Sequence, residues 1–244
     1  MNGKKVDVLA FSPHPHDAEW GMGGTVARWT SEGKQVVFVV CTNGEKGSSS
    51  PDLKAVELAK IREQEEADAA RHLGVREVIF LRHPDLELEA TAQFKKEVLR
   101  LILTYQPEIV GTRDPYQGKY VSNPDHRVCG HTVMDACWPY ALAPNMYPDL
   151  LQEGLKVHHV KEVWLWTPEA PNYRLDISDT FERKKEALRL HRSQILDWAD
   201  GPGGYDEAHD NFFKMITERN AAAAEGTSFK FAEAFVRIKL PPRL

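Results

Sequence analysis

Residues 35–41 (Gln-Val-Val-Phe-Val-Val-Cys) constrain the fold of this chain more than any other stretch. Their β-branched and aromatic side chains are typical of a strand that is buried on both faces, as in a parallel sheet covered by helices. A second apolar run, residues 6–11, precedes this strand, and a helical pattern lies between the two. A strand–helix–strand order of this kind predicts an α/β protein with a mainly parallel sheet.

The same alternation continues to the end of the chain. Further strands are expected at residues 78–81, 108–111, 160–167 and 229–240, and helices at residues 53–73, 93–105, 181–198 and 207–224, with another directly after residue 127. Gly74 stands where the C-cap of a helix would lie. We expect the C-terminal part, from about residue 155 to residue 244, to complete the sheet and the cleft.

The composition excludes several classes of protein. The chain has 244 residues and a net charge of −5, and this mild acidity argues against a nucleic-acid partner. No stretch reaches the ~18 continuous apolar residues of a membrane span, and Lys4-Lys5 lead straight into the first strand without a leader. The three cysteines, Cys41, Cys129 and Cys137, are an odd and widely spaced set, which is typical of reduced core thiols in a cytoplasmic protein.

The turn after the first strand carries two histidines and two acidic residues, in the order Ser-Pro-His14-Pro-His16-Asp17-Ala-Glu19. In open α/β sheets, ligands bind just beyond the carboxyl ends of the strands. Imidazole nitrogens and carboxylate oxygens are the usual zinc ligands outside thiolate sites, and three protein ligands leave one position open for water. This turn can supply His14 and Asp17, with His16 as a further candidate, and it needs another ligand from elsewhere.

Two other interpretations of this turn compete with that of a metal site. An isolated His-Pro-His-Asp sequence is often an ordinary polar turn, because proline is a common turn residue. The glycines that follow could indicate a dinucleotide-binding loop. That loop needs a Gly or Ala three residues after Gly23, however, and Val26 stands there.

A second polar cluster follows the fourth expected strand and ends a long loop, residues 112–123, with Asn123-Pro-Asp125-His126. His126 lies at a loop-to-helix junction on the same edge of the sheet, so it can be the missing metal ligand. Asp125 beside it is suited to hold a ligand in place through a hydrogen bond. His131 is a rival, but it lies further into the helix.

Four more charged residues are expected to line the substrate side of the cleft. They are Glu45, Arg62, Asp85 and Asp114. Three lie in or beside loops at the carboxyl edge, whereas Arg62 reaches there from a helix. The alternative is solvated surface, above all for Asp114.

Taken together, these motifs resemble the LmbE-like, or PIG-L, family of zinc-dependent N-acetylglucosaminyl deacetylases. The resemblance covers nearly the whole chain and rests on the motifs around residues 14–25, 42–45, 62–74, 84–85, 123–127, 193–194 and 232–235. It implies one Rossmann-like, three-layer domain over residues 1–244. It also implies a hydrolase that removes an acetyl or other acyl group from an amino sugar or glycoconjugate, and a homo-oligomer, either a trimer or a hexamer.

The resemblance further implies one Zn²⁺ per chain, held by His14, Asp17 and His126, with Asp125 among the catalytic residues. Two positions depart from the family pattern. His16 stands where the family has the aspartate that acts as general base, and Asn123 stands where it has a histidine that stabilises the oxyanion.

These departures leave three possibilities open. The first is a zinc-dependent N-deacetylase in which His16 is the general base and Asn123 donates a hydrogen bond to the oxyanion. The second is a catalytically impaired, zinc-bearing carbohydrate-binding protein, in which His16 could be a fourth zinc ligand. The third is hydrolysis of another amide or of an ester on the same scaffold.

Overall fold

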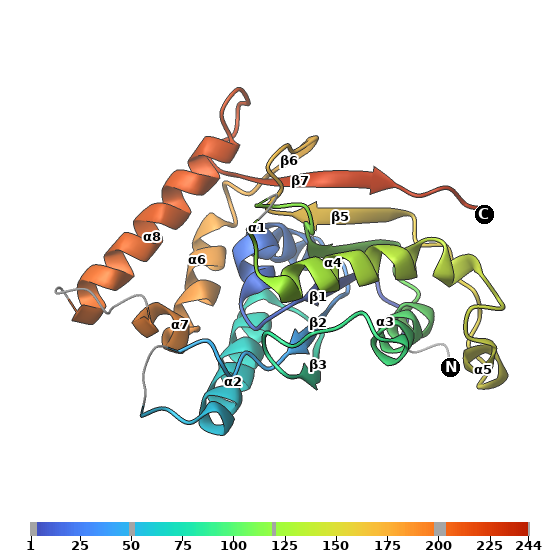
Figure 1. Cartoon of the computed structure of the whole chain (residues 1–244). Coiled ribbons are helices and arrows are strands. Elements are labelled where there is room, and N and C mark those ends of the chain that lie inside the picture. Colours follow the sequence, from blue (N-terminus) through green and yellow to red (C-terminus); the bar gives the residue numbers. More distant parts are fainter. Residues whose placement is uncertain (1–3, 49–51, 119–120, 198–203, 244) are drawn as a thin grey trace.

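The structure is a computed structural model that describes residues 4–48, 52–118, 121–197 and 204–243. At its centre is a sheet of seven strands in the order β3-β2-β1-β4-β5-β7-β6 (Figure 1). The strands are β1 (Val8–Ser12), β2 (Val36–Thr42), β3 (Glu77–His83), β4 (Ile109–Arg113), β5 (Glu162–Trp166), β6 (Tyr173–Asp176) and β7 (Ala232–Lys239). The first five strands are parallel, and β7 and β6 extend the β5 edge in antiparallel pairing.

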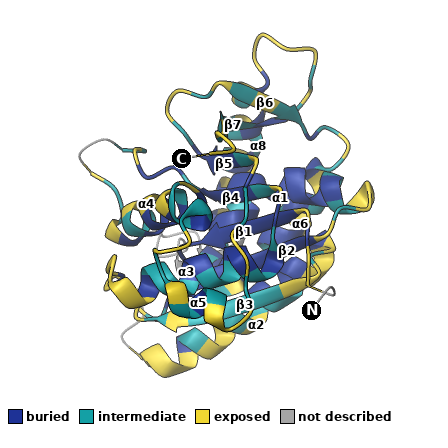
Figure 2. Cartoon of the chain, turned by 90° about the vertical axis from the view of Figure 1, so that its right-hand side faces the viewer, coloured by how far each residue is buried: buried dark blue, intermediate teal, exposed yellow. Residues whose placement is uncertain are grey.

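Helices cover both faces of the sheet. They are α1 (Asp17–Ser31), α2 (Ala55–Leu73), α3 (Ala92–Tyr105), α4 (Pro124–Cys137), the 3₁₀ turn η1 (Tyr140–Leu142), α5 (Pro148–Gln152), α6 (Phe181–Arg189), α7 (Arg192–Asp197) and α8 (Gly204–Ala223). Apolar side chains of α3 and α4 form one core with the sheet, and those of α1 and α2 form a second core on the opposite face. Strands β1 and β2, which lie between these cores, are buried along their whole length (Figure 2).

This architecture confirms the predicted α/β class and the mainly parallel sheet. Strand β2 is buried along its whole length, as its β-branched sequence requires in a sheet that is covered on both faces. The three cysteines are free and buried. Gly74 adopts a left-handed conformation (φ 79°) at the C-cap of α2, as its position predicts. None of the helices in the described ranges has the length and apolar character needed to cross a membrane.

The structure differs from the sequence expectation at the single helix predicted over residues 181–198. It forms two helices, α6 and α7, with a break at Leu190 and His191, whereas Trp198 lies outside the described residues. The backbone N–H groups of both residues at the break bond to carbonyls three residues earlier, which ends α6 in a tight turn. This turn directs the His191 side chain into the protein, where it is 2% exposed. Strand β6 was also not expected.

The strand order determines where a site can form. From β1 the chain moves to β2 and β3 on one side, and it then returns to β4 on the other side. The carboxyl ends of β1 and β4 therefore border a crevice, because their following helices pack on opposite faces of the sheet. Both histidine-containing clusters of the sequence lie at this crevice.

Candidate metal and active site

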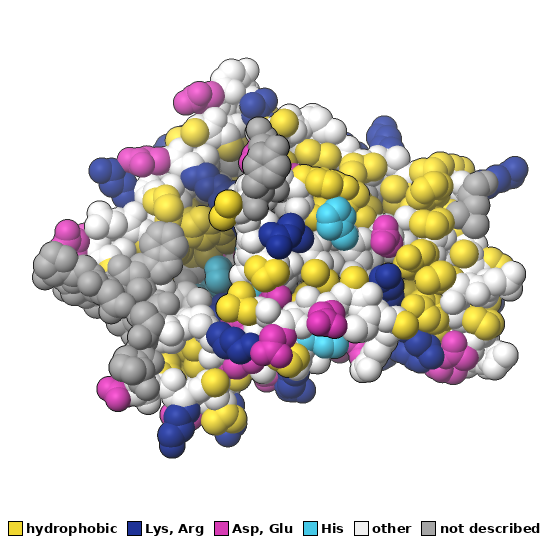
Figure 3. Space-filling model, viewed as in Figure 1, with side chains coloured by type: hydrophobic (Ala, Val, Ile, Leu, Met, Phe, Trp, Pro, Cys, Tyr) yellow, Lys and Arg dark blue, Asp and Glu magenta, His cyan; other side chains and the backbone are white. Residues whose placement is uncertain are grey.

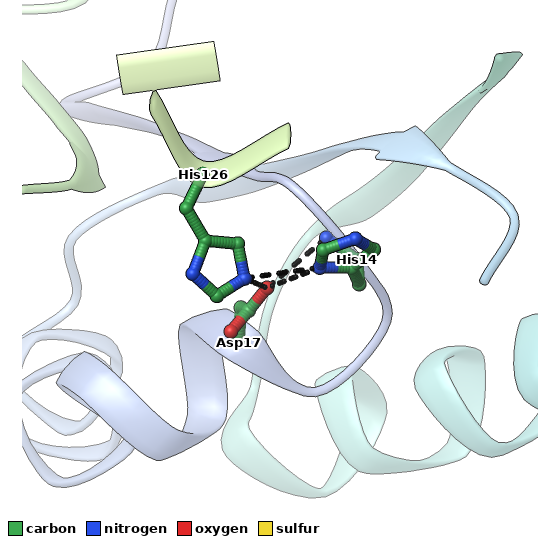
Figure 4. Close-up of side chains that lie close together, drawn as sticks. All are labelled: His14, Asp17 and His126. Atoms are coloured by element: carbon green, nitrogen blue, oxygen red, sulfur yellow. Dashed lines mark hydrogen bonds and ion pairs between the residues drawn. The ribbon is translucent and has the colours of Figure 1, made fainter. Parts of the chain in front are cut away.

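Three side chains meet at the crevice between β1 and β4 (Figure 4). His14 lies in the turn after β1, Asp17 is the first residue of α1, and His126 lies in the first turn of α4. Nδ1 of His14 is 3.0 Å from Oδ2 of Asp17 and 3.1 Å from Nε2 of His126. Nε2 of His126 is 3.2 Å from the same Asp17 oxygen. Three ligand atoms from two distant segments thus face one point.

Local backbone features place these atoms. His16 has φ 85°, in the left-handed region, and this reverses the chain into α1. The backbone N–H of His14 donates to Oδ2 of Asp17 at 3.2 Å, which closes the turn. On the other segment, Oδ1 of Asn123 accepts from the backbone N–H of Asp125 at 2.8 Å and caps α4, whose first residue is a proline.

The atoms fit a zinc ion in both type and spacing. Tetrahedral zinc ligands at about 2.0–2.2 Å from the ion lie about 3.3–3.5 Å from one another. The observed separations of 3.0–3.2 Å require only a small outward shift. Two imidazoles and one carboxylate also form the donor set of an open, catalytic type of zinc site.

The second ring nitrogen of His14 is held by two carboxylates. Nε2 lies 3.1 Å from Oδ1 of Asp85 and 3.2 Å from Oδ2 of Asp125. Asp125 is completely buried, and its oxygens also accept the backbone N–H groups of Leu86 and Leu88. A carboxylate behind a metal-binding histidine fixes the tautomer and orientation of the ring. Asp125 therefore orients the His14 ring, and its carboxylate is not directed to the open side of the site.

These contacts determine the charges at the site. Burial alone would lower the pKa of His14, but hydrogen bonds to Asp125, Asp17 and Asp85 outweigh it and raise the pKa well above its usual value. Burial would raise the pKa of Asp17, but His126 and His14 hold it well below the usual range. Without a metal, positive charge on the His14 imidazole therefore compensates for part of the charge of the surrounding carboxylates.

His16 makes its contacts with residues other than these three ligand-type residues. Its Nδ1 lies 3.2 Å from Nη2 of Arg62, and its ring lies edge-on to that of His191, with the centroids 5.9 Å apart. Burial lowers the pKa of His16 to about 3, so its ring is neutral at physiological pH. Because Arg62 can only donate, Nδ1 must accept and Nε2 carries the proton. In the described part of the chain, His16 belongs to no group with metal-ligand spacing.

The four residues expected to line the substrate side have other partners. Arg62 is 2% exposed and donates to the carbonyls of Gly44 and Pro15. Both carboxylate oxygens of Glu45 accept the backbone N–H of Asp85. The free oxygen of Asp85 accepts the backbone N–H of the residue after Glu45, while its other oxygen contacts His14. These three residues thus hold the loops that surround the candidate metal ligands, and within the described part of the chain Nε of Arg62 is the one nitrogen of its guanidinium without a partner.

Asp114 has a hydrogen-bond partner in its own loop, and His131 lies outside the ligand group, as its place further into the helix predicts. Asp114 is buried, and its Oδ1 accepts the backbone N–H of Tyr116 at 2.9 Å, so it orders the loop after β4. His131 is exposed and lies edge-on to the Tyr116 ring, away from the three ligand atoms.

Two basic residues near the site were missed in the sequence. Arg113, the last residue of β4, has Nη1 3.4 Å from the second oxygen of Asp17. Its place at the carboxyl end of a strand was the available signal. Arg219 on α8 borders a cavity of about 170 Å³ beside the start of α1, and its guanidinium lies 5.3 Å from the Trp20 ring. On the side of the molecule drawn in Figure 3, hydrophobic, basic and histidine side chains surround a hollow.

The fold and these side chains define an α/β protein with a histidine–carboxylate candidate metal centre at the switch point of a parallel sheet. Residues 9–137 match the family described as PIG-L, GlcNAc-PI de-N-acetylase. The chain is 37% identical over 188 residues to a diacetylchitobiose deacetylase of Thermococcus kodakarensis, covering 77% of this chain and 70% of that protein. It is 26% identical over 193 residues to a probable N-acetyl-alpha-D-glucosaminyl L-malate deacetylase 2 of Bacillus anthracis, covering 77% of this chain and 81% of the relative.

A solved structure is similar over nearly the whole chain. It is that of the N,N'-diacetylchitobiose deacetylase from Pyrococcus horikoshii complexed with its inhibitor MPG, with a TM-score of 0.87 and 31% identity. The match covers 96% of this chain and 84% of that one. The chain belongs to the PIG-L family, and the predicted resemblance is confirmed.

Proposed function

We propose that this protein is a zinc-dependent N-deacetylase that hydrolyses the acetamide of an N-acetylglucosamine-type sugar or glycoconjugate. The observation that carries the proposal is the convergence of three atoms, from His14, Asp17 and His126, within 3.0–3.2 Å of one another at the β1/β4 crevice. The relatives reported above support the substrate class, since each is named as a deacetylase of an acetylated glucosamine compound.

We infer that these three side chains hold one zinc ion. Zinc in such a site lowers the pKa of the attacking water towards ~7 and polarises the acyl oxygen. Asp125 and Asp85 hold the His14 ring through Nε2, which would leave Nδ1 free to bind the ion. Arg113 contacts Oδ1 of Asp17, which would leave Oδ2 free to bind the ion. The net reaction consumes one water and yields one acetate and one free amine.

His16 is proposed to be a hydrogen-bond donor and not the general base. Its Nδ1 accepts from Arg62, so Nε2–H is the group that it can offer to an acyl oxygen or a water. Asn123 is committed through Oδ1 to the cap of α4 and keeps its amide N–H groups for donation. The chain is therefore proposed to work without the carboxylate that the family resemblance implies at position 16.

The alternative of a binding protein without activity has less support. The relatives reported above are named as deacetylases, and the three ligand atoms keep the spacing of an open metal site. We also propose that the protein is cytoplasmic and forms a homo-oligomer, a trimer or a hexamer. Three buried free thiols support the first point. Exposed apolar residues, among them Val121 and Trp138, support the second.

The test is hydrolysis of N,N'-diacetylchitobiose by the zinc-loaded protein, with acetate and primary amine quantified in parallel. We expect both products in equal amounts, and we expect a chelator to stop their release. An O-acetylated sugar and an N-acetylated amino acid, assayed alongside, separate sugar N-deacetylation from ester or general amide hydrolysis. Saturable binding of the disaccharide without either product would support the binding-protein alternative and overturn the proposal.

A further inference from the structure

A second group of ligand-type side chains lies behind the turn that carries His16. It consists of Glu19 on α1, Glu66 on α2 and His191 at the break between α6 and α7. Glu19 and Glu66 are 0% exposed and His191 is 2% exposed. Nε2 of His191 is 3.8 Å from Oε1 of Glu19 and 3.9 Å from Oε2 of Glu66. Three elements from distant parts of the sequence thus bring two carboxylates and one imidazole together in the interior.

Most polar atoms of this group have no partner. Within the described part of the chain, both oxygens of Glu19, Oε1 of Glu66 and both ring nitrogens of His191 make no hydrogen bond. The separations of 3.8 and 3.9 Å are too long for direct hydrogen bonds. Buried polar groups are almost always paired, since an unpaired one costs about 1–3 kcal/mol and a charged one costs more. One ligand-type atom from each of the three residues lies within 4.8 Å of the other two. This grouping, together with the unpaired atoms, indicates that something binds between the three side chains.

The charges of the group favour a divalent cation. Two carboxylates and a neutral imidazole carry a charge of −2, and a divalent ion makes the buried site neutral. Without an ion, burial raises the pKa of Glu66 to about 8, because a charge there is uncompensated. The charge of Arg62 acts on Glu66, but its terminal nitrogens are committed to the carbonyls of Gly44 and Pro15. It therefore does not neutralise these carboxylates by direct contact.

We propose that Glu19, Glu66 and His191 bind a second divalent metal ion, separate from the ion at His14, Asp17 and His126. The mixture of carboxylate oxygens with one imidazole nitrogen suits ions such as Mn²⁺ or Zn²⁺ better than Ca²⁺ or Cu⁺. The ligand-type atoms of this group lie further apart than those of the first site. They reach an ion placed between them when the carboxylates turn inward. The competing occupant is a water molecule, because buried waters typically make about three hydrogen bonds to groups of this kind.

The second ion would act on the first site through the backbone. Oε2 of Glu66 accepts the backbone N–H of His16 at 2.8 Å, and His16 lies between the metal ligands His14 and Asp17. An ion that fixes the Glu66 carboxylate therefore also fixes the left-handed turn at His16. The role is structural, and the proposal is independent of the reaction that the first site performs.

The test counts metal ions in the full-length chain. Wild type, His126→Ala, Glu66→Gln and the double variant are expressed with Mn²⁺ or Zn²⁺, freed of excess metal by gel filtration, and analysed by mass spectrometry of the metals. We expect two ions per chain in wild type, one in each single variant and none in the double variant. Glu57→Gln, an exposed position on the same helix, should retain two. The melting temperature of His126→Ala should also rise with added Mn²⁺, and that of the double variant should not.

A wild type that saturates at one ion per chain, together with a metal-free His126→Ala, would overturn the proposal in favour of water. If Glu66→Gln fails to fold, the comparison of wild type with His126→Ala still decides between the two. Circular dichroism spectra of all variants establish that each metal count belongs to a folded chain.

Discussion

Oδ2 of Asp17 lies 3.2 Å from Nε2 of His126, although the two residues lie in the first turns of helices that pack on opposite faces of the sheet. Helices on opposite faces can meet in this way where the strand order reverses, between β1 and β4. The topology of the sheet therefore assembles the candidate metal site. A change that moves either helix terminus should weaken metal binding without touching a ligand.

Asp125→Asn should weaken zinc binding about 10–100-fold while leaving all three ligands in place. The amide that replaces the carboxylate accepts hydrogen bonds less strongly, so it holds the His14 ring less firmly. Competition with a chromogenic chelator measures the affinity. Asp135→Asn, at an exposed position on the same helix, is the control. Equal affinities for both variants would show that Asp125 does not support His14.

The grouping of His14, Asp17 and His126 could be predicted from the sequence, because each of them follows a strand that is recognisable from its apolar residues. Strands of a parallel sheet end at the same edge, so the ligands had to be neighbours. The roles of Glu45, Arg62 and Asp85 were not predictable in this way. A charged residue near a site has the same sequence signature whether it faces a substrate or bonds to buried backbone groups.

The group of Glu19, Glu66 and His191 was also beyond sequence reasoning. A continuous helix was expected over residues 181–198, and no residue there is a strong helix breaker. The break that turns His191 inward depends on packing of α6 against α1 and α2. The place of such a helix break is determined by tertiary contacts and not by the local helix propensity of the sequence.

His16→Asp should increase the rate of deacetylation at neutral pH, because a carboxylate can accept the proton of the attacking water and a neutral imidazole with Nε2 protonated cannot. A general base contributes about 10²–10⁴-fold, so an increase of at least ~10-fold in kcat is expected. His16→Asn serves as the control, since its amide donates a hydrogen bond but accepts no proton. A fall in kcat for His16→Asp, with His16→Asn equally slow, would identify the imidazole itself as the base.

Arg62→Met should lower the free energy of unfolding by about 1–3 kcal/mol, because it removes the guanidinium donor of the Pro15 carbonyl and leaves the Gly44 carbonyl with only the backbone N–H of Gly47. Urea denaturation measures the change. Arg71→Met, at an exposed position of the same helix, should stay within about 0.5 kcal/mol of wild type. If Arg62→Met is as stable as wild type and its KM alone rises, then Arg62 contacts the substrate as the sequence first indicated.

Glu66→Gln should change how the stability of the metal-free protein depends on pH. Burial raises the pKa of Glu66 in the folded chain from its usual 4.5 to about 8. Protonation of Glu66 stabilises the folded chain, and this stabilisation is complete at pH values below the pKa of Glu66 in the unfolded chain. It is lost as the pH rises through the pKa of Glu66 in the folded chain. Between about pH 5 and pH 9, with a chelator present, wild type should lose at least about 1.4 kcal/mol more than Glu66→Gln. Parallel curves for the two proteins would rule out a raised pKa at this position.

The central claim is that His14, Asp17 and His126 hold the metal on which deacetylation depends. The most direct measurement is acetate release from N,N'-diacetylchitobiose by zinc-loaded wild type, His126→Ala and His131→Ala. His131 is exposed on the same helix and lies outside the ligand group, so it is the matched control. We predict that His126→Ala loses at least ~100-fold in rate and that His131→Ala keeps the wild-type rate. A His126→Ala protein that releases acetate as fast as wild type would contradict the account.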